Sequence, residues 1–295
     1  MILSASRIGS LMTAAIVGLS LHGNATAQPA EAQLFNTVRE IEKKLDARIG
    51  VLVRDTASEW EWGHRQDERF LMASTFKSVL CGAVLDRVER DQMSLDEPLE
   101  IRRDELVAYS PVTEKAAGET MSVSDLCLAT LDISDNTAAN ILIARLGGTQ
   151  EVTAFARSVG DAVTRLDRIE PDLNLFVPGD PRDTTTPAAI LTTWESMLLG
   201  DALSSKHRAL LLDWMSRGGV TGALLRASTP DNWHVADKSG GGQQHTRNLV
   251  AMVTPPDDEP HLVAIYVSDT PADWAARNQA VKEIGEAILR MISHR

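Results

Sequence analysis

The stretch NLVAMVTPPDDEPHLVAIYVSD, residues 248–269, predicts two β-strands separated by a polar turn. Each half is a short run rich in Val, Leu, Ala and Ile, and the prolines and acidic residues between them end both runs. The other end of the chain repeats this pattern, because RIGVLVRD (48–55) and EWEWGH (59–64) also predict a pair of strands around a turn. Both ends of the chain are therefore expected to build a sheet.

Helical spacing surrounds these strands and fills the middle of the chain. One helix is expected before the first strand pair and one after the last, from apolar side chains three or four positions apart: Val38, Ile41, Leu45, Val281, Ile284 and Ile288. Strand-rich ends around a helical middle predict an α/β fold, with an antiparallel sheet flanked by helices and an inserted all-α domain. The boundaries that we expect are 28–66 with 217–295 for the discontinuous α/β domain and 67–216 for the all-α domain.

The N-terminal 27 residues have the pattern of a secretory signal peptide. Arg7 precedes an apolar run, and Ala25, Thr26 and Ala27 are small residues at a cleavage point. The run is shorter than the roughly 20 residues of a membrane-spanning helix. We expect an exported, periplasmic protein without a membrane or lipid anchor, or a secreted one if the host has no outer membrane.

The charge of the chain excludes several partners. It carries 41 acidic and 29 basic side chains, a net charge of −12, without basic runs, which argues against nucleic acid and anionic membranes. The seven histidines and two cysteines show no spacing typical of zinc ligands. We expect no metal, no cofactor and a monomer.

Two features leave alternatives open. An exported pair, Cys81 and Cys127, favours a disulfide over two buried free thiols. Residues 166–187 show neither helical nor strand periodicity, and a loop of this length is usually functional. Within it, an Arg168 to Asp183 ion pair could close the loop, or both side chains could be solvated.

Three short motifs carry possible chemistry. Ser74 and Lys77 form an S-x-x-K at the start of an apolar helical pattern, which places lysine and serine on one helix face. The tripeptide SDN occupies residues 134–136 ahead of another helical pattern, and DKSGGG occupies 237–242 after a strand-like run. Each motif alone is an ordinary helix start or strand end.

In this order the three motifs match the S-x-x-K, SDN and K-T/S-G set of class A β-lactamases and penicillin-binding proteins. The sequence resembles the class A serine β-lactamases from about Phe35 to its last helix. The segment RIEPDLN, residues 168–174, resembles the omega loop of that family, here 165–187. The resemblance implies a two-domain fold of the serine β-lactamase and penicillin-binding-protein type.

The resemblance also implies roles for individual residues. Ser74 is the expected nucleophile, Lys77 activates it, and Ser134 passes a proton to the leaving nitrogen. Glu170 and Asn174 are expected to hold the water that deacylates the enzyme, and the acylation base is either Lys77 or Glu170. The implied substrate is a small-molecule β-lactam, and the implied function is antibiotic resistance.

Substrate-binding and structural positions follow from the same resemblance. Tyr109 is the expected cleft wall, the N–H of Gly241 and that of Ser74 form the oxyanion hole, and Asn278 is a neighbour of the substrate-carboxylate arginine. The remaining substrate-binding residues implied are Asn136, Lys238, Ser239, Gly240 and Arg247. The structural features implied are a Cys81–Cys127 disulfide, an Arg168–Asp183 clamp and a cis bond from Glu170 to Pro171. Since Ala73 and Gly242 replace the bridging cysteines of some carbapenemases, that specialisation is not expected.

Other functions share parts of this pattern. A D-alanyl-D-alanine peptidase carries the three motifs without the deacylating loop. A serine-dependent glutaminase shares a related fold and the S-x-x-K, but it needs neither a secretion signal nor this loop. A sensor acylated permanently by β-lactams would need a membrane-spanning segment. A purely structural protein would leave every motif a coincidence. The sequence favours a β-lactamase over these and does not rank its substrates.

Overall fold

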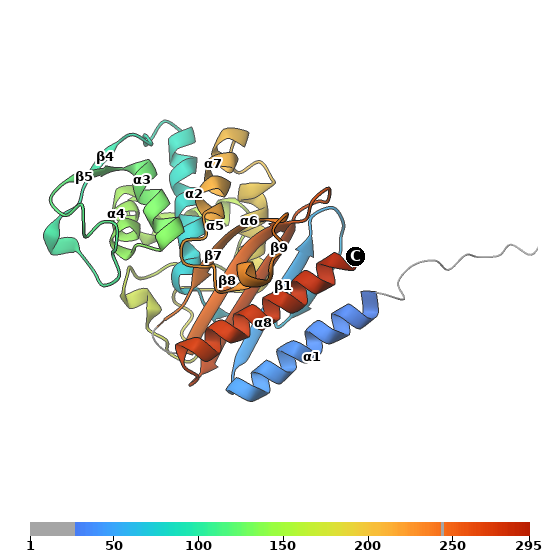
Figure 1. Cartoon of the computed structure of the whole chain (residues 1–295). Helices are drawn as coiled ribbons and strands as arrows, with labels where there is room; N and C mark the ends of the chain where they lie inside the picture. The colour runs from blue at the N-terminus through green and yellow to red at the C-terminus, as the bar shows by residue number, and fades with distance from the viewer. Residues whose placement is uncertain (1–26, 243–244) are drawn as a thin grey trace, which may run out of the picture.

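The computed structural model describes residues 27–242 and 245–295, so the expected signal peptide lies almost wholly outside the described residues. Its main sheet is antiparallel, five-stranded and ordered β2-β1-β9-β8-β7 (Figure 1). The first two of these strands in the chain come from its N-terminal part and the others from its C-terminal part, as the sequence predicted. The strands are β1 (Arg48–Asp55), β2 (Glu61–His64), β7 (His234–Gly240), β8 (His245–Thr254) and β9 (His261–Thr270).

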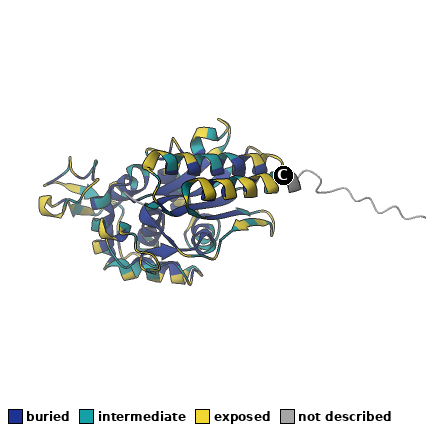
Figure 2. Cartoon of the chain, turned by 90° about the horizontal axis from the view of Figure 1, so that it is seen from below, coloured by how far each residue is buried: buried dark blue, intermediate teal, exposed yellow. Residues whose placement is uncertain are grey.

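The two faces of the sheet pack against different helices. On β8, Leu249, Ala251 and Val253 belong to an apolar cluster formed with α1 (Ala27–Leu45) and α8 (Trp274–Ser293). Figures 1 and 2 show these two helices side by side over the sheet, with their outer sides exposed and the strands beneath them buried. The alternate side chain Val250 belongs to the cluster of the helical part, because successive strand residues point to opposite faces.

The helical part surrounds α2, which is buried on all sides over its first ten residues. A helix that is apolar all round is expected at the centre of a domain rather than at its surface. The helices of this part are α2 (Phe76–Glu89), α3 (Val123–Leu128), α4 (Asn136–Leu146), α5 (Thr149–Ser158), α6 (Pro187–Leu198) and α7 (Ser205–Ser216). Short strands are β3 (Phe70–Leu71), β4 (Pro98–Glu100), β5 (Thr120–Ser122) and β6 (Thr184–Thr185). Single turns are η1 (Ala73–Thr75), η2 (Arg103–Glu105), η3 (Ala129–Ile133, a π-helix), η4 (Asp172–Asn174) and η5 (Leu225–Ser228).

The expected Cys81–Cys127 disulfide is not formed. Both cysteines are free and fully buried, and the Cys81 Sγ lies 3.8 Å from the carbonyl oxygen of Cys127. Burial raises the pKa of the Cys81 thiol well above its usual value, so the thiol is neutral in the core. The two thiols instead pack as small apolar groups in the core around α2.

Within the described residues, no helix combines the length and apolar character that crossing a membrane requires.

Candidate active site

Ser74 and Lys77 lie one helical turn apart at the start of the central helix. Ser74 belongs to the turn η1 and lines a cavity of about 930 Å³, whereas Lys77 is in the first turn of α2 and fully buried. Ala73, just before the serine, adopts a left-handed backbone with φ of 43°, which is strained for a residue with a Cβ. The chain therefore bends sharply to present Ser74 to the cavity.

The sheet holds this bend in place. The amide Nδ2 of Asn248 on β8 donates to the carbonyl oxygens of Leu71 (2.8 Å) and Met72 (3.0 Å). Gly240, the last residue of β7, is so close that a Cβ there would lie 2.6 Å from the Met72 oxygen and 3.0 Å from the Ser74 nitrogen. Only glycine fits at this position, and it brings the end of β7 against the Ser74 N–H.

The amine of Lys77 is held among three groups. Its Nζ donates to the Asn136 Oδ1 (2.6 Å) and the Ser134 carbonyl oxygen (2.8 Å), and it lies 3.2 Å from the Glu170 Oε1. Burial lowers the pKa of Lys77, and the charge of Glu170 opposes this effect. A buried amine with a lowered pKa is suited to accept a proton from a neighbouring hydroxyl.

Ser134 lies between two lysines. Its Oγ accepts from the Nζ of Lys238 (3.1 Å) and from that of Lys77 (3.4 Å). Burial, with the charge of Lys77, lowers the pKa of Lys238 to about 7. Ser134 has a left-handed backbone with φ of 65° at the end of η3, which turns its side chain into the site.

Glu170 lies under the cavity and is 2% exposed. Its Oε2 accepts from the Asn174 Nδ2 (2.5 Å), and its main chain is clamped by Asn140, which accepts from the Glu170 N–H and donates to the Glu170 carbonyl oxygen, both at 2.9 Å. The bond from Glu170 to Pro171 is cis, as expected. The Oδ1 of Asn174 is buried and accepts no hydrogen bond from the described part of the chain, and the buried Oε1 of Glu170 faces the amine of Lys77 at 3.2 Å.

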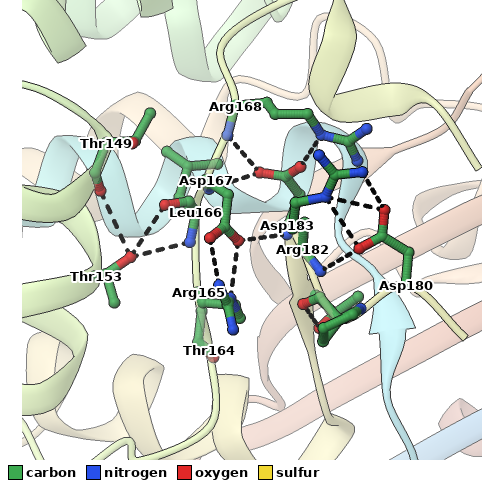
Figure 3. A network of polar contacts seen from close by, with 12 residues as sticks. Thr149, Thr153, Thr164, Arg165, Leu166, Asp167, Arg168, Asp180, Arg182 and Asp183 are labelled. Carbon is green, nitrogen blue, oxygen red and sulfur yellow. Dashed lines mark hydrogen bonds and ion pairs between the residues drawn. The ribbon is translucent and has the colours of Figure 1, made fainter.

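The loop that carries Glu170 is closed by the ion pair that the sequence suggested. Asp183 is fully buried and accepts from the Arg168 Nε (2.5 Å) and from the backbone N–H groups of Asp167 (2.7 Å) and Arg168 (2.9 Å). Figure 3 shows this contact inside a larger polar network, in which Arg165 pairs with Asp167 at the start of the loop. The solvated alternative for Arg168 and Asp183 is therefore wrong.

Arg247 forms a second polar corner of the cavity. Its Nε donates to the Asn278 Oδ1 (2.7 Å) and its Nη1 to the Gly240 carbonyl oxygen (3.1 Å). Burial, together with the charge of Arg277, lowers the pKa of Arg247 to about 10, a value that leaves it cationic at neutral pH. Ser239, Gly241 and Tyr109 also line the cavity, and the tyrosine is exposed.

The structure thus brings every sequence-predicted catalytic and substrate-binding residue into one region. All of them line the cavity except Lys77, Glu170 and Lys238, which are buried behind its wall, in contact with one another or with Ser134. Within the described residues, no group of three or more His, Cys, Asp or Glu side chains is arranged to hold a metal ion.

Two important side chains were not identified from the sequence. Asn140 clamps Glu170, and its position one turn after Asn136 on the same helix face was the available signal. Asp135, the middle residue of SDN, caps α4 by accepting from the Ala138 N–H (2.9 Å) and also accepts from the Thr113 N–H (3.0 Å). Asp135 thereby fixes the segment next to Tyr109, the exposed residue of the cavity wall.

The fold and the site together define the class of this protein. A serine and a lysine share one turn of a central helix, a second lysine and serine face them, and a buried carboxylate with an amide lies alongside. This arrangement belongs to serine hydrolases that react through a covalent acyl-enzyme.

Comparison with known proteins identifies the family. The model of the β-lactamase enzyme family matches residues 33–292. The chain is 47% identical to a β-lactamase of Rhodobacter capsulatus over 98% of both chains, and 44% identical to β-lactamase AER-1 of Aeromonas hydrophila over 86% of this chain and 84% of that protein. The structure of the class A β-lactamase of the last common ancestor of Gram-negative bacteria superposes with a TM-score of 0.86 at 46% identity, covering 88% of this chain and 99% of that one. The chain belongs to the class A β-lactamases.

Proposed function

We propose that the protein hydrolyses the β-lactam ring of penicillins and some cephalosporins through an acyl-enzyme on Ser74, and thereby confers resistance to these antibiotics. Lys77 takes the proton of the Ser74 hydroxyl as the oxygen attacks the lactam carbonyl. The backbone N–H groups of Ser74 and Gly241 stabilise the developing oxyanion, at about 3 to 4 kcal/mol for each donor. Ser134 delivers a proton to the ring nitrogen as it leaves.

Lys238, Ser239 and Arg247 bind the carboxylate of the substrate. Cations and hydroxyls form charge-assisted hydrogen bonds to such a group, and Arg247 is held for this purpose by Asn278. On the opposite side, Asn136 orients the amide side chain of the substrate, and Tyr109 forms the wall.

A single observation carries the hydrolytic half of this proposal. The buried Asn174 Oδ1 has no donor among the described residues, and the buried Glu170 Oε1 has the Lys77 amine, at 3.2 Å, as its ion-pair partner. The Glu170 and Asn174 side chains are joined by the hydrogen bond from the Asn174 Nδ2 to the Glu170 Oε2. These two side chains suit one water molecule, and Glu170 is the general base that directs it at the acyl-enzyme. A peptidase or a permanently acylated sensor needs no such pair.

Intact mass spectrometry tests the proposal directly. The purified protein is mixed with excess benzylpenicillin and sampled from seconds to an hour while the lactam absorbance is followed. Loss of many equivalents of lactam with only a fleeting adduct is expected. A lasting adduct on Ser74 with about one equivalent consumed would indicate a sensor or peptidase, and absence of both would overturn the proposal.

We further propose export to the periplasm and action as a monomer, with a discontinuous α/β domain at 28–66 and 217–295 and an all-α domain at 67–216. The signal-like residues 1–27 support the first point. Its test is the N-terminal residue of the native protein, expected at or next to Gln28, and gel filtration tests the second. Limited proteolysis tests the boundaries, because cleavage is expected near 66 and 217.

Replacing Asp183 by Asn is expected to loosen the loop that holds Glu170. The change leaves the partly buried Arg168 cation without a counter-charge, and it should lower the free energy of unfolding by about 2 to 4 kcal/mol and Tm by roughly 5 to 12 °C. The lifetime of the benzylpenicillin acyl-enzyme should lengthen because the general base is less well placed. Thermal melts and stopped-flow absorbance measure both effects.

The matched control for Asp183→Asn is Asp213→Asn, which breaks the exposed ion pair with Arg217 (2.8 Å) and should change neither Tm nor the acyl-enzyme lifetime. If Asp183→Asn and Asp213→Asn changed Tm and the acyl-enzyme lifetime equally, the Arg168–Asp183 ion pair would not be what holds the loop.

The activity is expected to fall at alkaline pH because of Lys238. Its surroundings in the free enzyme are Lys77, Arg247, Asp237 and Glu170, and its pKa of about 7 means that it is a cation below this pH and neutral above it. Since kcat/KM reports the free enzyme, kcat/KM for benzylpenicillin should decline above about pH 7, by up to about tenfold per pH unit.

The variant Lys238→Arg tests whether deprotonation of Lys238 causes the alkaline decline in kcat/KM. Arginine keeps its charge over the whole range, so the alkaline decline should move to a pH at least about one unit higher. The measurement is a pH profile of kcat/KM for both proteins, with Lys206→Arg on the surface as the control. The same midpoint in all three would exclude Lys238 as the titrating group.

A further inference from the structure

Trp274 covers the arginine of the substrate-carboxylate corner. It begins α8, is 45% exposed and lines the cavity. The Cζ of Arg247 lies 4.5 Å from the centroid of its indole ring, and the Cζ of Arg277 lies 5.4 Å away. An indole at this distance from a guanidinium gives a cation–π contact, which is stronger when the cation is removed from water. Arg247 is 5% exposed.

The position of the indole depends on a glycine of the facing strand end. A Cβ on Gly241 would lie 2.8 and 2.9 Å from the indole carbons Cζ3 and Cη2, distances that real Cβ atoms do not adopt. The backbone of Gly241 is not in the left-handed region, so this site needs glycine for space alone. Trp274 and Gly241 are therefore a matched pair, 33 residues apart in the sequence, in which the missing side chain of one makes room for the ring of the other.

This packing determines what Arg247 can offer to a ligand. Its Nε and Nη1 are used by Asn278 and Gly240, and its Nη2 has no hydrogen bond in the described part of the chain. With one face of the guanidinium against the indole, the free edge points in a fixed direction. A carboxylate that reaches this edge lies beside an exposed apolar ring.

We propose that Trp274 is a specificity-determining and positioning residue: it fixes Arg247 and limits the size of the substituent that a β-lactam carries next to its carboxylate. This inference rests on the proposed function. In penicillins the neighbours of the carboxylate are two methyl groups, which the indole can contact. In cephalosporins the neighbour is the C3 substituent, and a large one meets the indole. The packing of Trp274 against Gly241 therefore favours β-lactams with a small substituent next to the carboxylate.

Kinetics of four proteins test this inference: the unaltered chain, Trp274→Ala, Gly241→Ala and the double variant. The substrates are benzylpenicillin and two cephalosporins that share an acyl side chain, one with a methyl group and one with a bulky group at C3. For Trp274→Ala, KM for benzylpenicillin should rise about five- to twentyfold with kcat changed less than about threefold. The preference for the methyl over the bulky cephalosporin should shrink by about fivefold or more.

The double variant separates packing from other effects of Gly241. Gly241→Ala should raise KM in the unaltered protein, but it should raise KM by a smaller factor in the Trp274→Ala background, because the two closest contacts of the added methyl, with the indole, are then gone and the Arg247 Cδ at 3.2 Å remains. Trp60→Ala is the control, since it removes a tryptophan stacked on Arg295 (3.8 Å) away from the cavity. An equal cost of Gly241→Ala in both backgrounds, or an unchanged KM in Trp274→Ala, would overturn the inference alone. Absence of lactam turnover in the unaltered protein would overturn the proposed function and the inference with it.

Discussion

Glu170→Ala is expected to stop the reaction at the penicilloyl enzyme. The carboxylate is the group placed to take a proton from a water, and it is held by Asn174 and by both main-chain contacts to Asn140. General-base assistance contributes about 10² to 10⁴ in rate, so deacylation should slow by at least that factor. Intact mass spectrometry should show an adduct on Ser74 that persists for minutes or longer.

Acylation should survive this change. Lys77 keeps its hydrogen bonds to Asn136 and to the Ser134 carbonyl oxygen, and these hold its amine in the site, with Lys77 one helical turn after Ser74. Removing the carboxylate also removes the charge that opposes the effect of burial, so the pKa of Lys77 should fall further. A less protonated amine is a better proton acceptor at neutral pH.

The control for this prediction is Glu40→Gln, an exposed glutamate on α1. It should turn over benzylpenicillin like the unaltered protein. Near-normal turnover by Glu170→Ala would refute the role of the loop, and loss of both adduct and turnover would assign Glu170 to acylation as well.

The sheet was predictable because its signals are local. The runs that became β1, β8 and β9 alternate side chains between two packed faces, and the turn between β8 and β9 is rich in Pro and Asp. No sequence pattern set the exact limits of β2, which begins at Glu61 rather than at residue 59. A single edge strand with one partner is less constrained by packing than the central strands.

The site was predictable where a motif carries its own geometry. The S-x-x-K spacing places Ser74 and Lys77 on one turn, and their relation follows from the helix alone. The left-handed backbone of Ser134 and the π-helix before it could not be predicted, because contacts with distant segments impose them. The close approach of Trp274 to Gly241 also could not be predicted, because these two residues are brought together only by the fold.

The cysteines show why a resemblance does not decide every feature. Cys81 and Cys127 are close in space, as the resemblance implied, yet they remain thiols in the core. The sequence specifies their proximity, whereas a disulfide also requires a specific geometry of the two side chains and an oxidant.

Lys77→Ala is expected to block acylation, whereas Glu170→Ala is expected to block deacylation. The change removes the proton acceptor one turn from Ser74 and leaves the buried Glu170 without its cation, so the rate of adduct formation should fall by about 10³ or more. Quenched-flow mass spectrometry with benzylpenicillin measures this rate. Lys206→Ala, an exposed lysine on α7, is the control and should acylate normally.

Comparing the two active-site variants decides the acylation base. If Lys77 is the base, Lys77→Ala forms the adduct slowly while Glu170→Ala forms it fast and keeps it. If Glu170 acts through a water, both variants acylate slowly, and Glu170→Ala shows the larger loss. The direct contacts of the lysine amine with Asn136, Ser134 and Glu170 favour the first outcome, because a proton accepted there can pass through Ser134 to the leaving nitrogen. A Lys77→Ala protein that melts normally and acylates at the rate of the unaltered enzyme would exclude Lys77 as the acylation base.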